Sequence, residues 1–417
     1  MKFRFAALVL LIPLLFSSCI FFVVGGTERP VQEKKYTAEI LWNREIFSWP
    51  GYNFPLASGV YYYFPADDIP GGGASVVKFN IETGKVIWES ERVKGRLEYP
   101  HKIGAYIYQP NNSGLIYVFN DLNGLLAATI MLGEDEPEAI NNGIRFNKYN
   151  AVSGSNFYWG NTPNGTEHPR GLMRLDSTKI DFTKDPRETQ VIIPELIWSR
   201  EGSMIATNIL SENDILYILE SRHGILAAID AETGSIIWEN SISQITREIS
   251  DCSLFLYDDK ILLIGTNLSC YDKYTGNMIY ETPKLEEPIN NYRLCVTLNN
   301  NYLYYNDNYY SSIVSLNAET GEKAWSRYIH SHYEPNTPEF YEHHYYYSFP
   351  QVYGDKLYIS SNSGLRVYNA ANGEFVGVDK SFNTGVIHSI IYNDILVFFS
   401  IQPGEYRIIN LTAIRCK

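Results

Sequence analysis

The chain has 417 residues, of which 45% are apolar and 14% aromatic, with 33 Tyr and only 19% charged residues. The apolar content is sufficient for a large core, and the many aromatic rings favour strands, whose pleated surfaces accommodate them. The net charge of −13, with no basic stripe, argues against nucleic acid as a partner, because phosphate binding needs clustered Lys and Arg.

The N-terminus has the pattern of an export signal. Lys2 and Arg4 precede an apolar run that ends in small residues before Cys19, which is the order found in a signal peptide. The last residues of the run resemble a bacterial lipobox, with Phe16 where that motif prefers Leu. The resemblance implies cleavage before Cys19 and lipidation of its thiol.

An uncleaved membrane anchor is the alternative. The apolar run continues past Cys19 to Val24 and is long enough to span a bilayer. Both interpretations place the rest of the chain outside the cytoplasm. We therefore expect a signal peptide at residues 1–18, a lipidated Cys and linker at 19–38, and a folded domain at 39–417.

A nine-residue pattern recurs along the folded domain. Residues 80–88 read NIETGKVIW, residues 230–238 read DAETGSIIW, and residues 317–325 read NAETGEKAW. A wider template, Asp or Asn, two variable residues, Thr or Asn, then Gly and an apolar run, fits six times. The six glycines are Gly84, Gly124, Gly234, Gly276, Gly321 and Gly373.

The pattern predicts a hairpin between two strands of a repeated unit. Asp or Asn bonds nearby backbone N–H groups, and Gly takes the left-handed conformation that a short loop requires. An aromatic residue follows in most copies, and we expect it to dock each unit against its neighbour; a ligand contact is the alternative. The aromatic residues of this series are Trp42, Trp88, Trp198, Trp238, Tyr280 and Trp325.

A second signal, a polar turn followed by a Tyr-rich strand, occurs eight times between Ser58 and Asn393. Each repeat unit therefore holds about four short strands, which is typical of a β-propeller blade. The fold class is all-β, with four-stranded antiparallel blades, and eight blades are expected, with seven as the alternative. The last unit lacks a strand, and residues 39–46, with Trp42, can supply it and close the ring.

The D/N-x-x-T-G-x-x-x-W copies resemble the pyrroloquinoline-quinone-type propeller repeat across residues 39–417. Two branches share this repeat. The quinoprotein alcohol dehydrogenases bind the quinone and calcium in the central channel. Members of the BamB family are outer-membrane lipoproteins without a cofactor. The resemblance to them implies an eight-bladed scaffold that contacts the barrel-forming subunit of the barrel-assembly machinery.

The chain departs from the enzyme branch. None of the five cysteines is adjacent to another, whereas those enzymes carry a disulfide between neighbouring cysteines, and no Asp/Glu/Asn cluster is assignable to calcium. It fits the BamB branch in length and lipobox, and differs in two insertions, at residues 133–150 and 160–196. We therefore expect no catalytic residue, no quinone, no calcium, and a protein partner at the periplasmic side of the outer membrane.

Two alternatives stay open: an extracytoplasmic lipoprotein that binds an unidentified ligand or partner, and a divergent quinone-dependent oxidoreductase. A His-rich stretch at residues 330–347 is a candidate binding segment for the first alternative, the ligand- or partner-binding lipoprotein. Its residues could bind a divalent metal or a partner, although their spacing matches no metal motif. The four histidines are His330, His332, His343 and His344. A disulfide among the last four cysteines is possible, and the sequence does not choose the pair. These cysteines are Cys252, Cys270, Cys295 and Cys416.

Overall fold

The structure, a computed structural model, describes residues 34–47, 56–67, 73–95, 97–111, 114–132, 146–161, 171–200, 205, 208–220, 223–242, 253–265, 267–282, 296–307, 312–328, 350–361, 364–382, 385–402 and 405–417. The chain divides into two compact units, Met1–Lys35 and Tyr36–Lys417. All named strands belong to the second unit.

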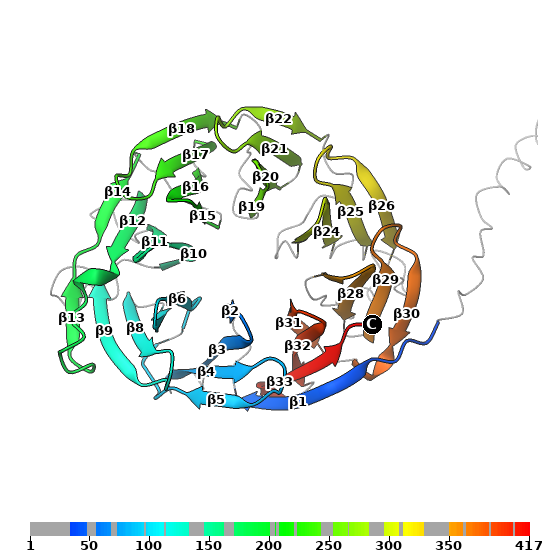
Figure 1. Cartoon of the computed structure of the whole chain (residues 1–417), viewed down its shortest axis with the longest axis horizontal. Helices are drawn as coiled ribbons and strands as arrows, with labels where there is room; N and C mark the ends of the chain where they lie inside the picture. The colour runs from blue at the N-terminus through cyan, green and yellow to red at the C-terminus, as the bar shows by residue number, and fades with distance from the viewer. Residues whose placement is uncertain are drawn as a thin grey trace, which may run out of the picture. The chain divides into compact units, whose positions relative to one another are not determined.

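Within Tyr36–Lys417, eight antiparallel blades form a ring, so the predicted eight-bladed propeller is confirmed and the seven-bladed alternative is wrong (Figure 1). In each blade the first strand is innermost and the fourth is on the outer side, where in blade 2 a fifth strand covers it. The first four blades comprise blade 1, β2 (Leu56–Ser58), β3 (Tyr61–Asp67), β4 (Ala74–Asn80) and β5 (Val86–Glu89); blade 2, β6 (His101–Ile103), β7 (Tyr106–Pro110), β8 (Leu115–Asn120) and β9 (Leu126–Leu132); blade 3, β10 (Phe146–Ser153), β11 (Asn156–Asn161), β12 (Gly171–Asp176) and β14 (Glu195–Trp198); and blade 4, β15 (Leu210–Glu212), β16 (Ile215–Glu220), β17 (Ile225–Asp230) and β18 (Ile236–Ser241).

The remaining blades repeat this order, and the final one takes its outer strand from the N-terminal end of the unit. They comprise blade 5, β19 (Ser253–Tyr257), β20 (Lys260–Ile264), β21 (Leu268–Asp272) and β22 (Met278–Glu281); blade 6, β23 (Val296–Asn299), β24 (Tyr302–Asp307), β25 (Ser312–Asn317) and β26 (Lys323–Tyr328); blade 7, β27 (Gln351–Tyr353), β28 (Lys356–Ser361), β29 (Gly364–Asn369) and β30 (Phe375–Asp379); and blade 8, β31 (Gly385–Tyr392), β32 (Ile395–Gln402), β33 (Glu405–Arg415) and β1 (Glu39–Phe47).

Strand β1 closes the ring as the sequence predicted. It pairs antiparallel with β33 over eight positions, from Glu39 opposite Arg415 to Phe47 opposite Ile408. The two ends of the propeller therefore cover each other's edge, which removes the unpaired edge that an open ring would leave.

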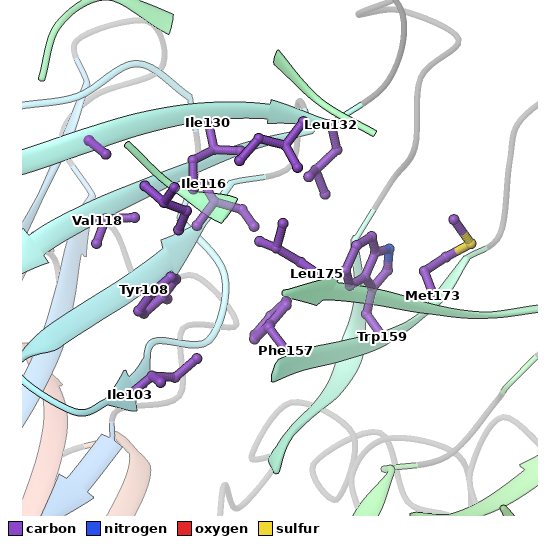
Figure 2. Packing of buried hydrophobic residues seen from close by; sticks show 13 residues of the cluster. Ile103, Tyr108, Ile116, Val118, Ile130, Leu132, Phe157, Trp159, Met173 and Leu175 are labelled. Carbon is purple, nitrogen blue, oxygen red and sulfur yellow. The ribbon is translucent and has the colours of Figure 1, made fainter. Parts of the chain in front are cut away.

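The core consists of the faces where neighbouring blades meet. Middle strands such as β17 and β29 are buried on both faces, because each blade is sandwiched between two others. Figure 2 shows one such interface, where Ile116, Val118 and Ile130 of blade 2 face Phe157 and Trp159 of blade 3. Apolar side chains from consecutive blades thus replace the single central core of an ordinary domain.

The insertion expected at 160–196 has a different extent. Residues 171–176 form β12, the third strand of blade 3, and the segment that replaces the glycine turn begins with the 3-10 helix η2 (Ser177–Lys179). It continues into β13 (Thr189–Ile192), which pairs in parallel with β9 and gives blade 2 a fifth strand. The insertion expected at 133–150 likewise overlaps β10. A second 3-10 helix, η4 (Lys380–Phe382), follows β30.

Candidate functional site at the blade junctions and rim

The repeated turn is held by its first residue. The backbone N–H of Gly276 donates to the carbonyl of Asp272 at 2.8 Å, and the Asp272 carboxylate accepts bonds from the N–H and hydroxyl of Thr275 at 2.8 Å each. These bonds lower the pKa of Asp272. Gly276 has φ of +70°, which favours a residue without Cβ. The other five glycine turns make the same glycine-to-carbonyl bond.

Five of the rim aromatic residues dock on the turn of the following blade. The Trp238 ring of blade 4 covers Gly276 of blade 5 so closely that a Cβ there would lie 2.3 Å from Cε3. Its indole N–H donates to the carbonyl of Lys273, three residues before the glycine, at 3.0 Å. Four other junctions have both contacts: the aromatic ring covers the glycine, and its N–H or O–H donates to the carbonyl three residues before that glycine. The ring, the covered glycine and the acceptor are Trp42, Gly84 and Ile81; Trp88, Gly124 and Asp121; Tyr280, Gly321 and Ala318; and Trp325, Gly373 and Ala370.

The junction between blades 3 and 4 is built differently. Gly234 lies against the carbonyl of Ile197 and not against the ring of Trp198, which is buried in the neighbouring core. The hydroxyl of Tyr158 makes the bond to Ala231 at 2.9 Å that an indole makes elsewhere. In blade 3 the glycine turn before the outer strand β14 is replaced by the segment that contains β13. Strand β14 therefore approaches the blade differently from the outer strands that follow a glycine turn.

A β-bulge aims the docking residue. In β18, Trp238 pairs with Ala228 and Ile236 pairs with Ile229, so Ile237 is an extra residue without a partner on β17. A bulge re-aims the side chains beside it. The same irregularity occurs one residue before Trp42, Trp88, Ala128, Tyr280, Trp325 and Gly377.

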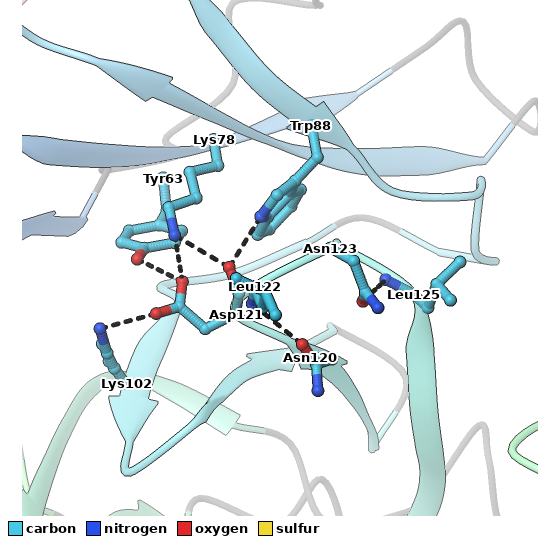
Figure 3. Close-up of polar contacts among 9 residues, drawn as sticks. All are labelled: Tyr63, Lys78, Trp88, Lys102, Asn120, Asp121, Leu122, Asn123 and Leu125. Atoms are coloured by element: carbon cyan, nitrogen blue, oxygen red, sulfur yellow. Dashed lines mark hydrogen bonds and ion pairs between the residues drawn. The ribbon is translucent and has the colours of Figure 1, made fainter.

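A buried ion network crosses the junction of blades 1 and 2 (Figure 3). The carboxylate of Asp121 accepts from Lys78 at 2.7 Å, from Lys102 at 2.7 Å and from the hydroxyl of Tyr63 at 2.5 Å. Burial raises the pKa of Asp121, but the bonds from Lys102, Lys78 and Tyr63 outweigh it, so the pKa is lowered. Lys78 is only 5% exposed and lies 4.3 Å from the centre of the Tyr61 ring.

Sequence reasoning missed this network, although the template contained a signal. The position three before the glycine is buried between blades and is apolar in four copies, such as Ile81 and Ala318. It is charged in two, Asp121 and Lys273. Each of these charges is paired, Lys273 with Glu212 at 2.6 Å, because an unpaired charge at a blade junction would be strongly destabilising.

Several predicted residues lie outside the described residues: Cys19, Cys252, Cys295 and the four histidines His330, His332, His343 and His344. Cys270 and Cys416 are free and buried. Among the described residues, no group of three or more His, Cys, Asp or Glu is placed to hold a metal ion. No described helix is long and apolar enough to cross a membrane.

Comparison with known proteins gives a family match over part of the chain. Residues 222–380 match the family described as outer membrane protein assembly factor BamB. The resemblance found in the repeat is thereby confirmed. The matched segment contains blades 5, 6 and 7 and the turns at Gly234, Gly276, Gly321 and Gly373. The comparison with curated proteins gives no match.

Solved structures share the fold of the whole propeller. BamB from Moraxella catarrhalis has a TM-score of 0.61 and 12% identity, covering 92% of this chain and 98% of its own. The quinohemoprotein alcohol dehydrogenase from Comamonas testosteroni has a TM-score of 0.61 and 11% identity, covering 90% of this chain and 76% of its own. A computationally designed protein, Ika8, has a TM-score of 0.57 and 10% identity, covering 92% and 99%. At these identities the likeness shows the fold alone.

Proposed function

We propose that the protein is a non-catalytic, lipid-anchored scaffold that binds a protein partner on the extracytoplasmic side of the membrane, as a BamB-like component of barrel assembly. The observation that carries this proposal is the match of residues 222–380 to the BamB family. The leader ending at Cys19 supports the anchor, because export followed by lipidation places the chain at a membrane surface.

The structure supports a scaffold through the way its polar groups are used. The charged residues Asp121, Lys78 and Lys273 described above all form ion pairs at blade junctions. The repeated aromatic and glycine residues likewise contact neighbouring blades. These groups hold the ring together.

The test is chemical crosslinking in native membranes, followed by purification through a C-terminal tag and mass spectrometry. The expected result is enrichment of the barrel-forming subunit of the assembly machinery over a control that carries residues 1–38 fused to an unrelated domain. That control has the same anchor and removes capture due to membrane location alone. Enrichment equal to the control would contradict the scaffold proposal.

The anchor and the enzyme alternative are tested separately. Mass spectrometry of the mature N-terminus is expected to show a lipid-modified Cys19, and Cys19→Ser is expected to release the protein from membranes. Adding pyrroloquinoline quinone and calcium to purified protein is expected to give no dye reduction with alcohols. Sustained dye reduction would replace the scaffold with an oxidoreductase.

A further inference from the structure

The outer strands of the blades are not equally covered. In blade 2 the outer strand β9 is covered by β13, and most of its residues are buried. In blades 4 and 5 the outer strands β18 and β22 have no fifth strand among the described residues, and their large apolar side chains are open to solvent. On these strands the exposed fractions are Ile236 45%, Ile237 49%, Met278 58% and Ile279 50%, and Tyr274, in the turn between β21 and β22, is 66% exposed. We call these five residues the rim patch.

The rim patch spans two neighbouring blades. Strands β18 and β22 follow one another along the rim in Figure 1, and Trp238 joins them by resting on Gly276. Ile237 precedes Trp238, and Tyr274 follows Lys273, whose carbonyl accepts the Trp238 indole N–H. An apolar area of this kind on a rim is typical of a protein-binding site.

The turns beside the rim patch are acidic. Asp230 and Glu232 lie in the β17–β18 turn, and Asp272 begins the β21–β22 turn. No described Lys or Arg pairs with these carboxylates. The nearby cations pair with other carboxylates: Lys273 with Glu212, and Lys260 with Asp259 and Glu319. Arg174 donates to the backbone carbonyl of Glu232, and its ion pair is with Glu195. The patch therefore presents apolar side chains beside three carboxylates that form no ion pair with the described Lys and Arg residues.

Thr hydrogen bonds stabilise the ionised form of two of these carboxylates. The backbone N–H and hydroxyl of Thr233 lower the pKa of Asp230, and the hydroxyl and N–H of Thr275 lower the pKa of Asp272. An Asp carboxyl is ionised at neutral pH in any case, and these bonds favour the charged form further. The acidic rim is a fixed property of the turns that build the ring.

We propose that the rim patch of blades 4 and 5 is a docking site for a basic, amphipathic segment of a partner protein, in which apolar residues alternate with Lys or Arg. This inference rests on the proposed scaffold function and names a surface and a partner chemistry for it. The apolar side chains supply contact area, and Asp230, Glu232 and Asp272 select cationic flanks.

The negative charge beside the rim patch favours a cationic protein segment over an anionic lipid, a nucleic acid or a second copy of this chain. Anionic lipid or nucleic acid would be repelled by the same carboxylates that attract Lys and Arg. A second copy docking through the same patch would bring two identical acidic turns together, because a two-fold interface juxtaposes the same surface. A cationic segment of a different protein meets no such repulsion.

The test uses purified full-length mature protein and a fluorescein-labelled ten-residue peptide in which Lys alternates with Val. Binding is measured by fluorescence anisotropy at low and high salt. We expect the affinity to fall about tenfold as salt rises from about 50 to about 500 mM, because the charges are exposed. A matched peptide with Glu in place of Lys is expected not to bind.

Two variants locate the binding. Ile237→Ser/Ile279→Ser removes apolar area, and Glu232→Gln removes a charge that caps no turn. We expect about tenfold weaker binding for the first and about threefold for the second, in line with the loss of an interface anchor and of a rim charge. Thermal unfolding confirms that each variant is folded.

Blade 1 provides the matched control, Val86→Ser/Ile87→Ser. These residues occupy the same positions beside Trp88 and are 46% and 42% exposed, but Lys85 adjoins them. The control is expected to leave affinity unchanged. Equal loss in the control, no loss in the rim-patch variants, or binding of the Glu peptide would overturn the inference.

The outcomes also separate the inference from the proposed function. If the peptide does not bind while the barrel-assembly subunit is still captured, only the rim-patch inference fails. If the peptide binds and the capture fails, only the BamB-like role fails. Sedimentation showing a dimer that Ile237→Ser/Ile279→Ser dissociates would identify a second copy as the occupant and overturn the inference.

Discussion

The contact between Trp238 and Gly276 offers a direct test of how the blades hold together. In Gly276→Ala the new Cβ would lie 2.3 Å from Cε3 of Trp238 and 2.7 Å from Cδ2, so the ring has to move. Overpacking of this kind costs about 1–3 kcal/mol. The left-handed φ of +70° adds about 1 kcal/mol for a residue with Cβ. The expected loss is about 3 kcal/mol.

Gly354→Ala separates the two contributions. Gly354 has φ of +58°, but no atom lies within 4 Å of the position that a Cβ would take there, so only the backbone cost of about 1 kcal/mol applies. A second separation comes from repeating Gly276→Ala in a Trp238→Ala background, where the obstructing ring is gone. There the glycine substitution is expected to cost about 1 kcal/mol, giving a coupling of about 2 kcal/mol between the two positions.

The free energy of unfolding is measured by urea denaturation followed by far-UV circular dichroism, which does not depend on the mutated Trp. The reasoning is refuted if Gly276→Ala is no more destabilising than Gly354→Ala. It is equally refuted if the full cost of Gly276→Ala persists after Trp238 is removed, because the ring contact would then not be its source.

Three further predictions concern other contacts. Asp121→Asn leaves Lys78 buried without a carboxylate and is expected to cost about 3 kcal/mol, against less than about 0.5 kcal/mol for exposed Asp355→Asn, both measured by urea denaturation. Because the pKa of Asp121 is lowered, its stabilisation is present above the unfolded pKa of about 4 and is lost as the pH falls through the folded pKa; the acid-induced loss of stability should therefore be shallower in Asp121→Asn. Burial raises the pKa of Cys270 to about 11, so mass spectrometry should show alkylation of its thiol at pH 8 only after unfolding. Phe182→Ala removes a ring stacked on Tyr106 at 4.4 Å and is expected to cost about 1 kcal/mol and to speed hydrogen exchange in β13.

The sequence predicts the ring because the information is local. Each turn carries its own Asx residue and glycine, and each blade carries a Tyr-rich strand, so counting them counts blades. Closure by β1 followed from a missing strand in the last blade and from the Trp at position 42. Nothing in these signals depends on distant residues.

The rest depends on contacts between distant parts of the chain. Strand β13 pairs with β9 across about sixty residues, in parallel, and its short sequence TQVI has no feature that names its partner. The network at Asp121 joins three other side chains from separate strands. Both arise from packing geometry, which a repeat pattern does not encode.

The bulge positions are places where the repeat does not require a particular side chain. The residue before each docking position is unpaired, and Ala324 fills it in blade 6 with a minimal side chain. Blades 1, 4 and 5 place Ile87, Ile237 and Ile279 there, each at least 42% exposed. An exposed Ile adds little to stability where Ala suffices, and it increases the tendency to aggregate. The ring does not need these side chains, and in blades 4 and 5 they coincide with acidic turns, which is why the rim patch is interpreted as a binding surface and not as part of the scaffold.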